Sequence, residues 1–318
     1  MSIKLQISSV IIFCLLAASC EKAIDFNGEE QLPRVVVRSE PEADTNVAVR
    51  ITYSRFFLAG GSFKVIKNAD VRLSVNGTQY TGLFNDSVYV FSYSAQEGDS
   101  LQLSVRMQNG GEDTVVTAGT RVPFRPSVQA KETIGNSCHF VLNDRRSEHN
   151  YYRLHLLSID TVYNYFDADS NYVFAGDPTA VGCDTIVETW WPLFGCSDAA
   201  LTSNMTSVIT IGGEETYEWL LFSDELFDGQ SREISLKPSD YDPFYYEEYK
   251  SASGSRSYIL VLESLSREAY LYELSVYKQE NGDIFMTEPV QMQCNIKGGL
   301  GIFGAKATTM VSLGTSSY

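Results

Sequence analysis

Side chains on which common catalytic and metal-binding motifs depend are scarce in this chain of 318 residues. It contains three histidines and no HExxH pattern, which argues against the zinc-protease motif. It also has no GxSxG pattern, the elbow that presents the nucleophile in α/β hydrolases. His155 lies within an alternating run and is expected to be structural. We therefore nominate no catalytic residue and expect a protein without enzymatic activity or cofactor.

Basic residues are scarce as well, with 24 Lys and Arg against 40 Asp and Glu and a formal net charge of -16. Such a surface repels phosphate backbones, so nucleic acid is not an expected partner. Apolar residues make up 44% of the chain, which is enough to bury a full core. The aromatic share of 12% favours strands over helical bundles. The length suits two domains.

Apolar runs long enough to span a bilayer are missing, although the N-terminus carries a short one at residues 10–16, after Lys4. This run is shorter than the ~18–20 residues that a spanning helix needs, and it predicts a signal peptide over residues 1–19. The small residues before Cys20 resemble a bacterial lipobox, although Leu16 lies one place early. We expect a lipid on Cys20 that anchors a tether, residues 20–33, to a membrane. The alternative is an ordinary secretory signal with Cys20 left as a thiol.

Cysteine usage suggests an oxidising compartment. The sequence has six cysteines, and the expected processing removes Cys14 and commits Cys20 to lipid. Four then remain, which permit three pairings: Cys138, Cys183, Cys196 and Cys294. The short loop favours a disulfide between Cys183 and Cys196, which leaves Cys138 to pair with Cys294. Free buried thiols are the alternative.

Closely spaced strand patterns predict a β-sandwich domain over residues 34–123, of immunoglobulin-like or transthyretin-like type. Its strands are expected at residues 35–37, 47–53, 71–75, 78–80, 88–91, 101–105 and 114–116. Asn76 and Gly77 separate two of them and favour a type I′ hairpin turn, because both residues tolerate a positive φ. Residues 123–126, with two prolines, mark the predicted boundary.

The remaining residues, 124–318, predict a larger β-rich domain with one helix, so that the whole chain is mainly β. Its strands are expected at residues 151–166, 184–191, 205–211, 219–222, 233–236 and 257–263. The helix is predicted from Arg267 to about Glu280, with Ser266 as its N-cap. Because alternate residues of this segment are also apolar, a strand is the alternative.

Several short motifs occur in order along the chain, at residues 20–25, 35–37, 68–71, 221–229, 288–290 and 295–304. Together they resemble a family of Bacteroidota outer-membrane lipoproteins known as domain of unknown function 4249. The resemblance implies an outer-membrane location, facing the cell exterior. It also implies an accessory role beside a TonB-dependent transporter. It supplies no catalytic residues to transfer to this chain.

The glycine-rich stretch 299–304 matches the GxGxxG pattern of dinucleotide sites. That site needs a helix that starts in the loop and an acidic residue about 20 positions later. No Asp or Glu follows Glu288, and residues 308–311 have a strand pattern, so no nucleotide is expected. We expect these glycines to permit close backbone packing or bulges beside a core strand.

Two acidic segments contain closely spaced carboxylates of the kind found in calcium sites. The loop that starts at Asp167 has Tyr172 where an EF-hand needs Gly, so a solvated hairpin tip is expected. Asp224, Glu225 and Asp228 are denser, and Asp224 and Asp228 are weak calcium candidates. We expect no metal there but a turn ordered by hydrogen bonds between Asp and the backbone.

Aromatic clusters are the best candidates for ligand or partner contact. Trp190, Trp191 and Phe194 lie in the loop that the predicted disulfide would close, and Tyr245 and Tyr246 lie in a second cluster. Exposed rings beside polar groups suit sugars, peptides or a partner protein. The alternative is that these rings fill the interior of the domain.

The function we predict from the sequence is that of a lipid-anchored docking or binding accessory without catalysis. One alternative is a surface hydrolase of glycans or peptides that uses carboxylates of the second domain. Another is an adhesin or structural surface protein.

Overall fold

The computed structural model describes residues 32–56, 60–109, 112–131, 137–146, 148–174, 176–203, 209–211, 213–239, 253–280 and 290–317. Over these residues the protein is mainly β, as predicted, with several antiparallel sheets. Cys20, Tyr245 and Tyr246 lie outside the described residues, as do the predicted signal peptide and most of the tether. No helix among the described residues is long and apolar enough to cross a membrane.

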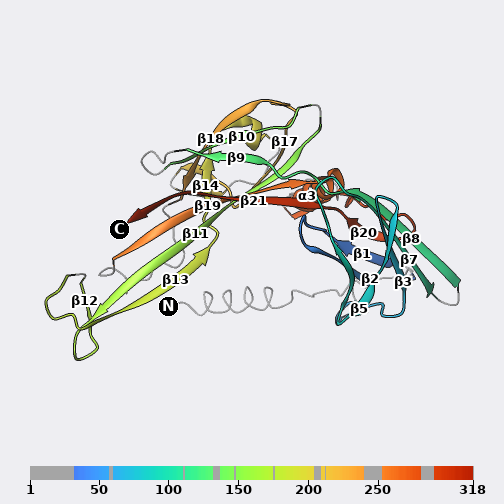
Figure 1. Cartoon of the computed structure of the whole chain (residues 1–318), viewed down its shortest axis with the longest axis horizontal. Helices are drawn as coiled ribbons and strands as arrows, with labels where there is room; N and C mark the ends of the chain where they lie inside the picture. Colours follow the sequence, from blue (N-terminus) through green and yellow to red (C-terminus); the bar gives the residue numbers. More distant parts are fainter. Residues whose placement is uncertain are drawn as a thin grey trace, which may run out of the picture.

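Two sheets form the N-terminal sandwich, at the blue to green end of the molecule in Figure 1. One sheet has the order β20-β1-β2-β6-β5: Leu300–Phe303, Val35–Ser39, Asn46–Tyr53, Val88–Ser94 and Leu83–Asn85. The other has the order β4-β3-β7-β8: Thr78–Thr81, Asp70–Val75, Ser100–Asn109 and Glu112–Arg121. Alternation along β3 buries Val71, Leu73 and Val75 between the sheets and leaves the residues between them more exposed. Asn76 and Gly77 have φ of 49° and 91°, as the predicted hairpin turn requires.

The sandwich is completed by a segment from the far end of the chain. β20 pairs in parallel with β1, and Ile296 and Phe303 are buried in the sandwich core. Gly301 has φ of 104°, and a Cβ there would overlap the carbonyl oxygen of Val37. The prediction that these glycines permit close backbone packing beside a core strand is therefore confirmed. Residues 296–307 belong to the sandwich in space, although they come after the predicted second domain in sequence.

The second region consists of two facing sheets. The longer sheet has the order β12-β11-β19-β21: Tyr172–Val173, Tyr151–Phe166, Ser253–Leu265 and Lys306–Ser317. β13 (Gly182–Trp190) and β17 (Leu220–Ser223) also pair with β11. The shorter sheet has the order β14-β18-β10-β9: Phe194–Cys196, Ser231–Pro238, Cys138–Asn143 and Ser127–Ala130. Buried side chains of both sheets, among them Leu154, Leu262 and Phe140, form one core.

The far half of β11 extends beyond this core and pairs with β13 to form an arm, which ends near β12 in Figure 1. At its tip, Asp167 accepts hydrogen bonds from the backbone N–H groups of Asp169 and Asn171, both at 2.9 Å. The loop from Asp167 is thus the hairpin tip that the sequence predicts, between β11 and β12. A small hairpin of β15 (Ile209–Ile211) and β16 (Glu214–Thr216) and the short helix α2 (Ala199–Thr202) lie elsewhere in the region.

The predicted helix is present as α3 (Arg267–Glu280), and it lies between the two regions in Figure 1. The Ser266 hydroxyl accepts a hydrogen bond from the N–H of Ala269 at 3.3 Å, as expected for an N-cap. The same oxygen accepts from the N–H of Ala305 at 3.1 Å, in the connection between β20 and β21. The start of α3 is therefore fixed to the segment that enters the sandwich.

Candidate ligand-binding site

Opposite faces of the β11–β19–β21 sheet have different character, because neighbouring strand residues point to opposite sides. One face packs into the core. On the other face His155 lies opposite Val261, which in turn lies opposite Met310. The next row of the same face places Arg153 opposite Glu263. The second face therefore carries ionisable side chains in the middle of a sheet, where apolar residues are usual.

A hollow of about 760 Å³ lies on this face. The sheet forms its floor, and three other segments form its walls: residues 190–193, residues 218–219 and Glu42 of the N-terminal region. The chain has three tryptophans, and all three line this hollow: Trp190, Trp191 and Trp219. Its size lies within the range of small-molecule and side-chain pockets, about 300–1,000 Å³.

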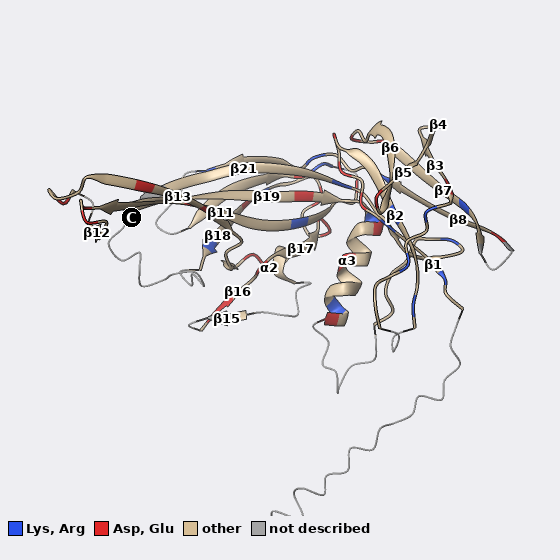
Figure 2. Ribbon diagram, turned by 90° about the horizontal axis from the view of Figure 1, so that it is seen from below, with Lys and Arg blue, Asp and Glu red and all other residues tan. Residues whose placement is uncertain are grey.

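An ion-pair network holds the floor of the hollow. The Glu263 carboxylate is 2.5 Å from Arg153 Nε and 2.7 Å from Lys306 Nζ. Lys306 also lies 3.8 Å from Glu42, whose carboxylate accepts a hydrogen bond from Thr308 Oγ1 at 2.5 Å. Because Glu42 belongs to the N-terminal region, the network joins the two regions. Figure 2 shows acidic and basic positions close together along β11 and β19.

These contacts determine the charge state of the buried groups. Burial by itself would raise the pKa of Glu263, but the hydrogen bonds and charges of Arg153 and Lys306 hold it below its ordinary value. Burial, aided by the charge of Arg153, lowers the pKa of His155 to about 4. Glu263 is therefore ionised and His155 is neutral at pH 7. The His155 imidazole packs edge to face against Trp191, with 5.5 Å between the two ring centres.

Two of the tryptophans are oriented by neighbours, and the ring of Trp190, which lies opposite Ser158, is on the inner face of the sheet. Trp190 Nε1 donates to Asp160 Oδ2 at 3.1 Å, and the Arg256 guanidinium lies 5.3 Å from the centre of the Trp190 ring. Arg256 and Asp160 are joined by two hydrogen bonds of 2.8 and 2.6 Å. Trp219 packs edge to face on Tyr277 of α3. Trp191 is the most open of the three, with 55% of its surface exposed.

The aromatic residues predicted to contact a ligand or partner do not all lie at the hollow. Trp190 and Trp191 line the hollow, but Phe194 is fully buried in the core between the two sheets, so its prediction as a contact residue is wrong. Phe194 fails because β14 joins the shorter sheet and directs this ring inward. Sequence reasoning missed Trp219, although it is the chain's third tryptophan, and Glu263, although a charge inside an apolar run was a usable indication.

The predicted disulfides are also wrong, since Cys138, Cys183, Cys196 and Cys294 are free thiols. Cys183 lies on the arm opposite Tyr165, and seven residues of strand carry it about 23 Å from Trp190. Cys138 and Cys196 flank β18, each opposite Leu236, which separates them by two strand spacings, about 10 Å. Burial raises the pKa of Cys138 to about 11, so this thiol stays protonated at neutral pH.

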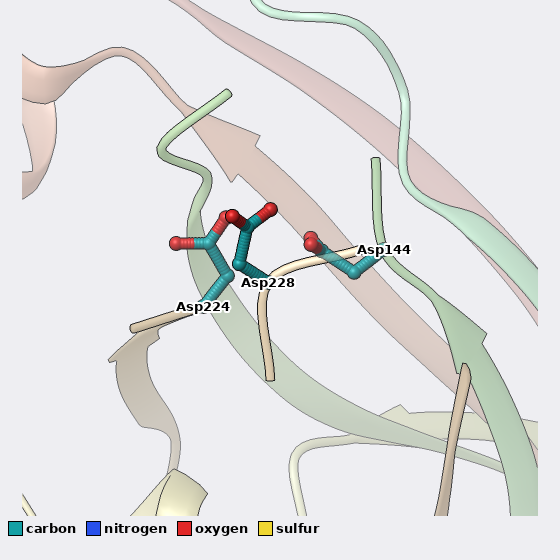
Figure 3. Close-up of side chains that lie close together, drawn as sticks. All are labelled: Asp144, Asp224 and Asp228. Carbon is teal, nitrogen blue, oxygen red and sulfur yellow. The ribbon is translucent and has the colours of Figure 1, made fainter. Parts of the chain in front are cut away.

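The weak calcium candidates Asp224 and Asp228 lie outside the hollow, in the turn between β17 and β18. The structure brings them together with Asp144, which follows β10, and the three carboxylates lie close together in Figure 3. Of the predicted carboxylates, Asp224 accepts a hydrogen bond from the backbone N–H of Asn150 at 2.9 Å, and the N–H of Gly229 in the turn donates to Asp144 at 2.8 Å. Sequence reasoning missed Asp144, which is about 80 positions away from the turn.

Comparison with known proteins gives one family match. The family model described as Domain of unknown function (DUF4249) matches residues 21–312. No curated protein matches the chain.

Two solved structures are weakly similar, each at 9% identity. The crystal structure of a DUF4785 family protein from Legionella pneumophila covers 72% of this chain with a TM-score of 0.22, and this chain spans 52% of its length. A structure of manganese lipoxygenase of Gaeumannomyces graminis, with part of zonadhesin of Komagataella pastoris, covers 90% of this chain with a TM-score of 0.19. This chain in turn covers 95% of that one. Neither similarity is strong enough to indicate function.

Proposed function

This chain belongs to the family described as Domain of unknown function (DUF4249), and we propose that it is a non-catalytic docking protein of the bacterial outer membrane. In this proposal a lipid on Cys20 anchors the chain, which faces the cell exterior and serves as an accessory to a TonB-dependent transporter. The tryptophan-lined hollow on the β11–β19–β21 sheet holds a segment of the partner protein.

The observation that carries the proposal is that all three tryptophan residues line one hollow, with the Trp191 ring against His155 on its floor. They come from separate places: Trp190 is the last residue of β13, Trp191 follows it, and Trp219 precedes β17. Tryptophan is enriched among the residues that dominate binding energy at protein interfaces. The Trp219 ring, which already packs on Tyr277, loses little freedom on binding, which favours affinity.

The charge of the hollow indicates the kind of partner segment. Three carboxylates line it, Glu42, Glu218 and Glu263, against two basic groups, Lys306 in the lining and Arg153, which pairs with Glu263. An excess of negative charge beside aromatic faces favours basic side chains, which interact with both. We therefore propose a partner segment that carries Lys or Arg beside apolar residues.

The state of the carboxylates supports docking over hydrolysis. A general acid needs a carboxyl group whose pKa is raised toward neutrality. Glu263, at the centre of the floor, instead has a lowered pKa because Arg153 and Lys306 hold its charged form. In the acidic cluster of the β17–β18 turn, Asp224 is fully buried and cannot contact a substrate.

The proposal is tested by capture of partners from the native membrane. An affinity-tagged chain is expressed in its own cell, the outer membranes are solubilised in detergent, and co-purified proteins are quantified by mass spectrometry. We expect a TonB-dependent transporter to co-purify with the wild type. Trp191→Ala should reduce its recovery at least about tenfold, because a central tryptophan often contributes 2 kcal/mol or more.

The matched control is Tyr172→Ala, which removes an exposed ring at the tip of the arm, 67% exposed in the structure. This variant should retain the partner. Equal losses in both variants, or loss in Tyr172→Ala alone, would place docking on the arm and contradict the role of the hollow. Recovery of no transporter, or absence of the tagged chain from the outer-membrane fraction, would overturn the proposed function.

A further inference from the structure

Three aspartates from two distant parts of the chain meet at one end of the shorter sheet. Asp144 directly follows β10, and Asp224 and Asp228 belong to the β17–β18 turn. One oxygen from each carboxylate lies within 4.8 Å of the others (Figure 3). Because Ca²⁺ binds oxygen ligands at about 2.3–2.6 Å, two oxygens on opposite sides of one ion lie about 4.8 Å apart. The cluster is therefore compact enough for its oxygens to share an ion.

The buried member of the cluster has an unused ligand atom. Asp224 is fully buried, and its Oδ2 accepts hydrogen bonds from the backbone N–H of Asn150 at 2.9 Å and from Asn150 Nδ2 at 3.1 Å. Its Oδ1 has no hydrogen-bond partner among the described residues. A buried polar atom without a partner costs about 1–3 kcal/mol, and more when it is charged. The burial of this oxygen without a partner therefore needs a physical explanation.

Within the described parts of the chain, neighbouring basic side chains do not form a close ion pair with this oxygen. One candidate is His149, whose Nδ1 lies 4.0 Å from Asp224 Oδ1 and whose side chain is 80% exposed. The Arg145 guanidinium lies over the ring of Phe124 instead, 3.9 Å from its centre. Burial raises the pKa of Asp224, and the charges of Asp144 and Asp228 add to this effect. The position therefore concentrates negative charge around a buried oxygen.

Other contacts hold the ligand groups in place, as is usual around a metal site. Asp144 Oδ1 accepts from the Tyr152 hydroxyl at 2.5 Å, and its Oδ2 accepts from the N–H of Gly229 at 2.8 Å. The backbone N–H of Asp224 donates to the carbonyl of Asn150 at 3.1 Å. Gly229 has φ of 65°, which closes the turn tightly. The start of β11, the end of β10 and the turn are thus oriented around the cluster.

We propose that Asp144, Asp224 and Asp228 form a binding site for a divalent cation, and that Ca²⁺ is the preferred ion. Three carboxylates form an all-oxygen ligand set, which suits a hard cation. Ca²⁺ is preferred to Mg²⁺ because it accepts irregular geometry, whereas Mg²⁺ demands a near-ideal octahedron. The bound ion uses the free oxygen of Asp224 and ties β10, β11 and the β17–β18 turn together. The site is independent of the hollow and of the docking proposal.

The test uses the purified mature chain, stripped with EDTA and dialysed, and titrates it with CaCl₂ by calorimetry and by thermal unfolding. We expect a single Ca²⁺ site with a dissociation constant at or below about 1 mM. The melting temperature should rise by about 3 °C at ten times that concentration. MgCl₂ should produce a weaker response.

Asp224→Asn provides the sharpest variant, since the amide keeps the size of the side chain but removes the buried charge. In EDTA this variant should be at least as stable as the wild type. In Ca²⁺ only the wild type should gain stability, so that the advantage of the variant in melting temperature shrinks or reverses. Glu225→Gln is the matched control, because it removes a charge from an exposed neighbour in the same turn and should keep the full response.

Asp228→Asn, at an exposed position, tests the site again if Asp224→Asn fails to fold. It should weaken Ca²⁺ binding at least about tenfold, since it removes one of three charged ligands. Absence of heat and of a thermal shift in the wild type at 10 mM Ca²⁺ (about ten times the upper limit above) would overturn the proposal. Equal shifts in the wild type and the variants would overturn it too, and binding of Zn²⁺ without Ca²⁺ would refute the stated preference.

Discussion

The two faces of the β11–β19–β21 sheet use the same strands for different purposes. On the inner face, Leu154 and Leu262 are fully buried against the shorter sheet. On the outer face, one residue away along each strand, Arg153 and Glu263 form an ion pair below the tryptophan-lined hollow. The inner face is covered by packed apolar side chains, whereas charged and aromatic side chains lie on the outer face.

This difference indicates on which face of the sheet substitutions should disturb the fold least. Apolar packing is non-directional and additive over area, so it stabilises the sheet in proportion to what is buried. A buried ion pair adds little net stability over an apolar pair, because desolvation offsets its attraction. The outer face therefore contributes mainly charge and the orientation of side chains in the hollow. Three experiments separate the stabilising contribution of the inner face from that of the outer face.

The largest effect is expected on the inner face. Leu262→Ala should lower the free energy of unfolding by about 4 kcal/mol, because it leaves a cavity in a core that cannot collapse fully. Val261→Ala, its neighbour on the outer face, should cost about 2 kcal/mol, since fewer atoms are removed at the edge of an open hollow. Urea unfolding measures both, and equal costs would contradict the division between the faces.

A smaller loss is expected when the outer network is broken. Glu263→Gln keeps the shape of the side chain but leaves Arg153 and Lys306 without their shared carboxylate, at a cost of about 3 kcal/mol. The matched control is Glu273→Gln, which removes a carboxylate of α3 that lies 3.6 Å from Arg153. It should cost less than about 1 kcal/mol. A cost for Glu263→Gln no greater than that of the control would show that the network has no structural role.

The smallest effect concerns pH. Burial and the charge of Arg153 hold the pKa of His155 at about 4, below its ordinary value of 6.5. Between these values the unfolded chain binds a proton on this imidazole and the folded chain does not, so stability falls as the pH is lowered through the window. From pH 7 to pH 5 the loss due to His155 should be about 2 kcal/mol.

His155→Gln removes this titration. The difference in unfolding free energy between pH 7 and pH 5 should therefore be smaller in the variant than in the wild type by that amount. Urea unfolding at both pH values measures the difference. The same pH dependence in the two proteins would show that the imidazole is protonated equally in the folded and unfolded chains.

Local patterns in the sequence predict much of the fold. β3, β4 and β11 lie where alternation and the Asn76–Gly77 turn place them, because strand period and turn chemistry act over a few residues. α3 starts after Ser266 for the same reason, since its cap is a contact three residues long. The glycines of residues 299–304 were assigned correctly to close packing, although their partner β1 lies more than 260 positions away.

Long-range contacts explain the failures. The disulfide between Cys183 and Cys196 was inferred from sequence spacing, but an extended strand carries Cys183 away along the arm. Phe194 was grouped with Trp190 and Trp191, yet it enters a different sheet three residues later. In both cases nearness in sequence was taken for nearness in space, and strand geometry separates residues quickly, at about 3.3 Å per residue.

By itself, the sequence determined the β class, most of the described strands, helix α3 and the tight turns, because each depends on interactions within about ten residues. The tertiary structure alone decided which distant residues became neighbours. It placed Glu42 beside Lys306, Trp219 on the same hollow as Trp191, and Asp144 beside Asp224. The hollow and the acidic cluster both arise from such pairings, since strand order and sheet packing are determined by burial of the whole chain and not by any local pattern.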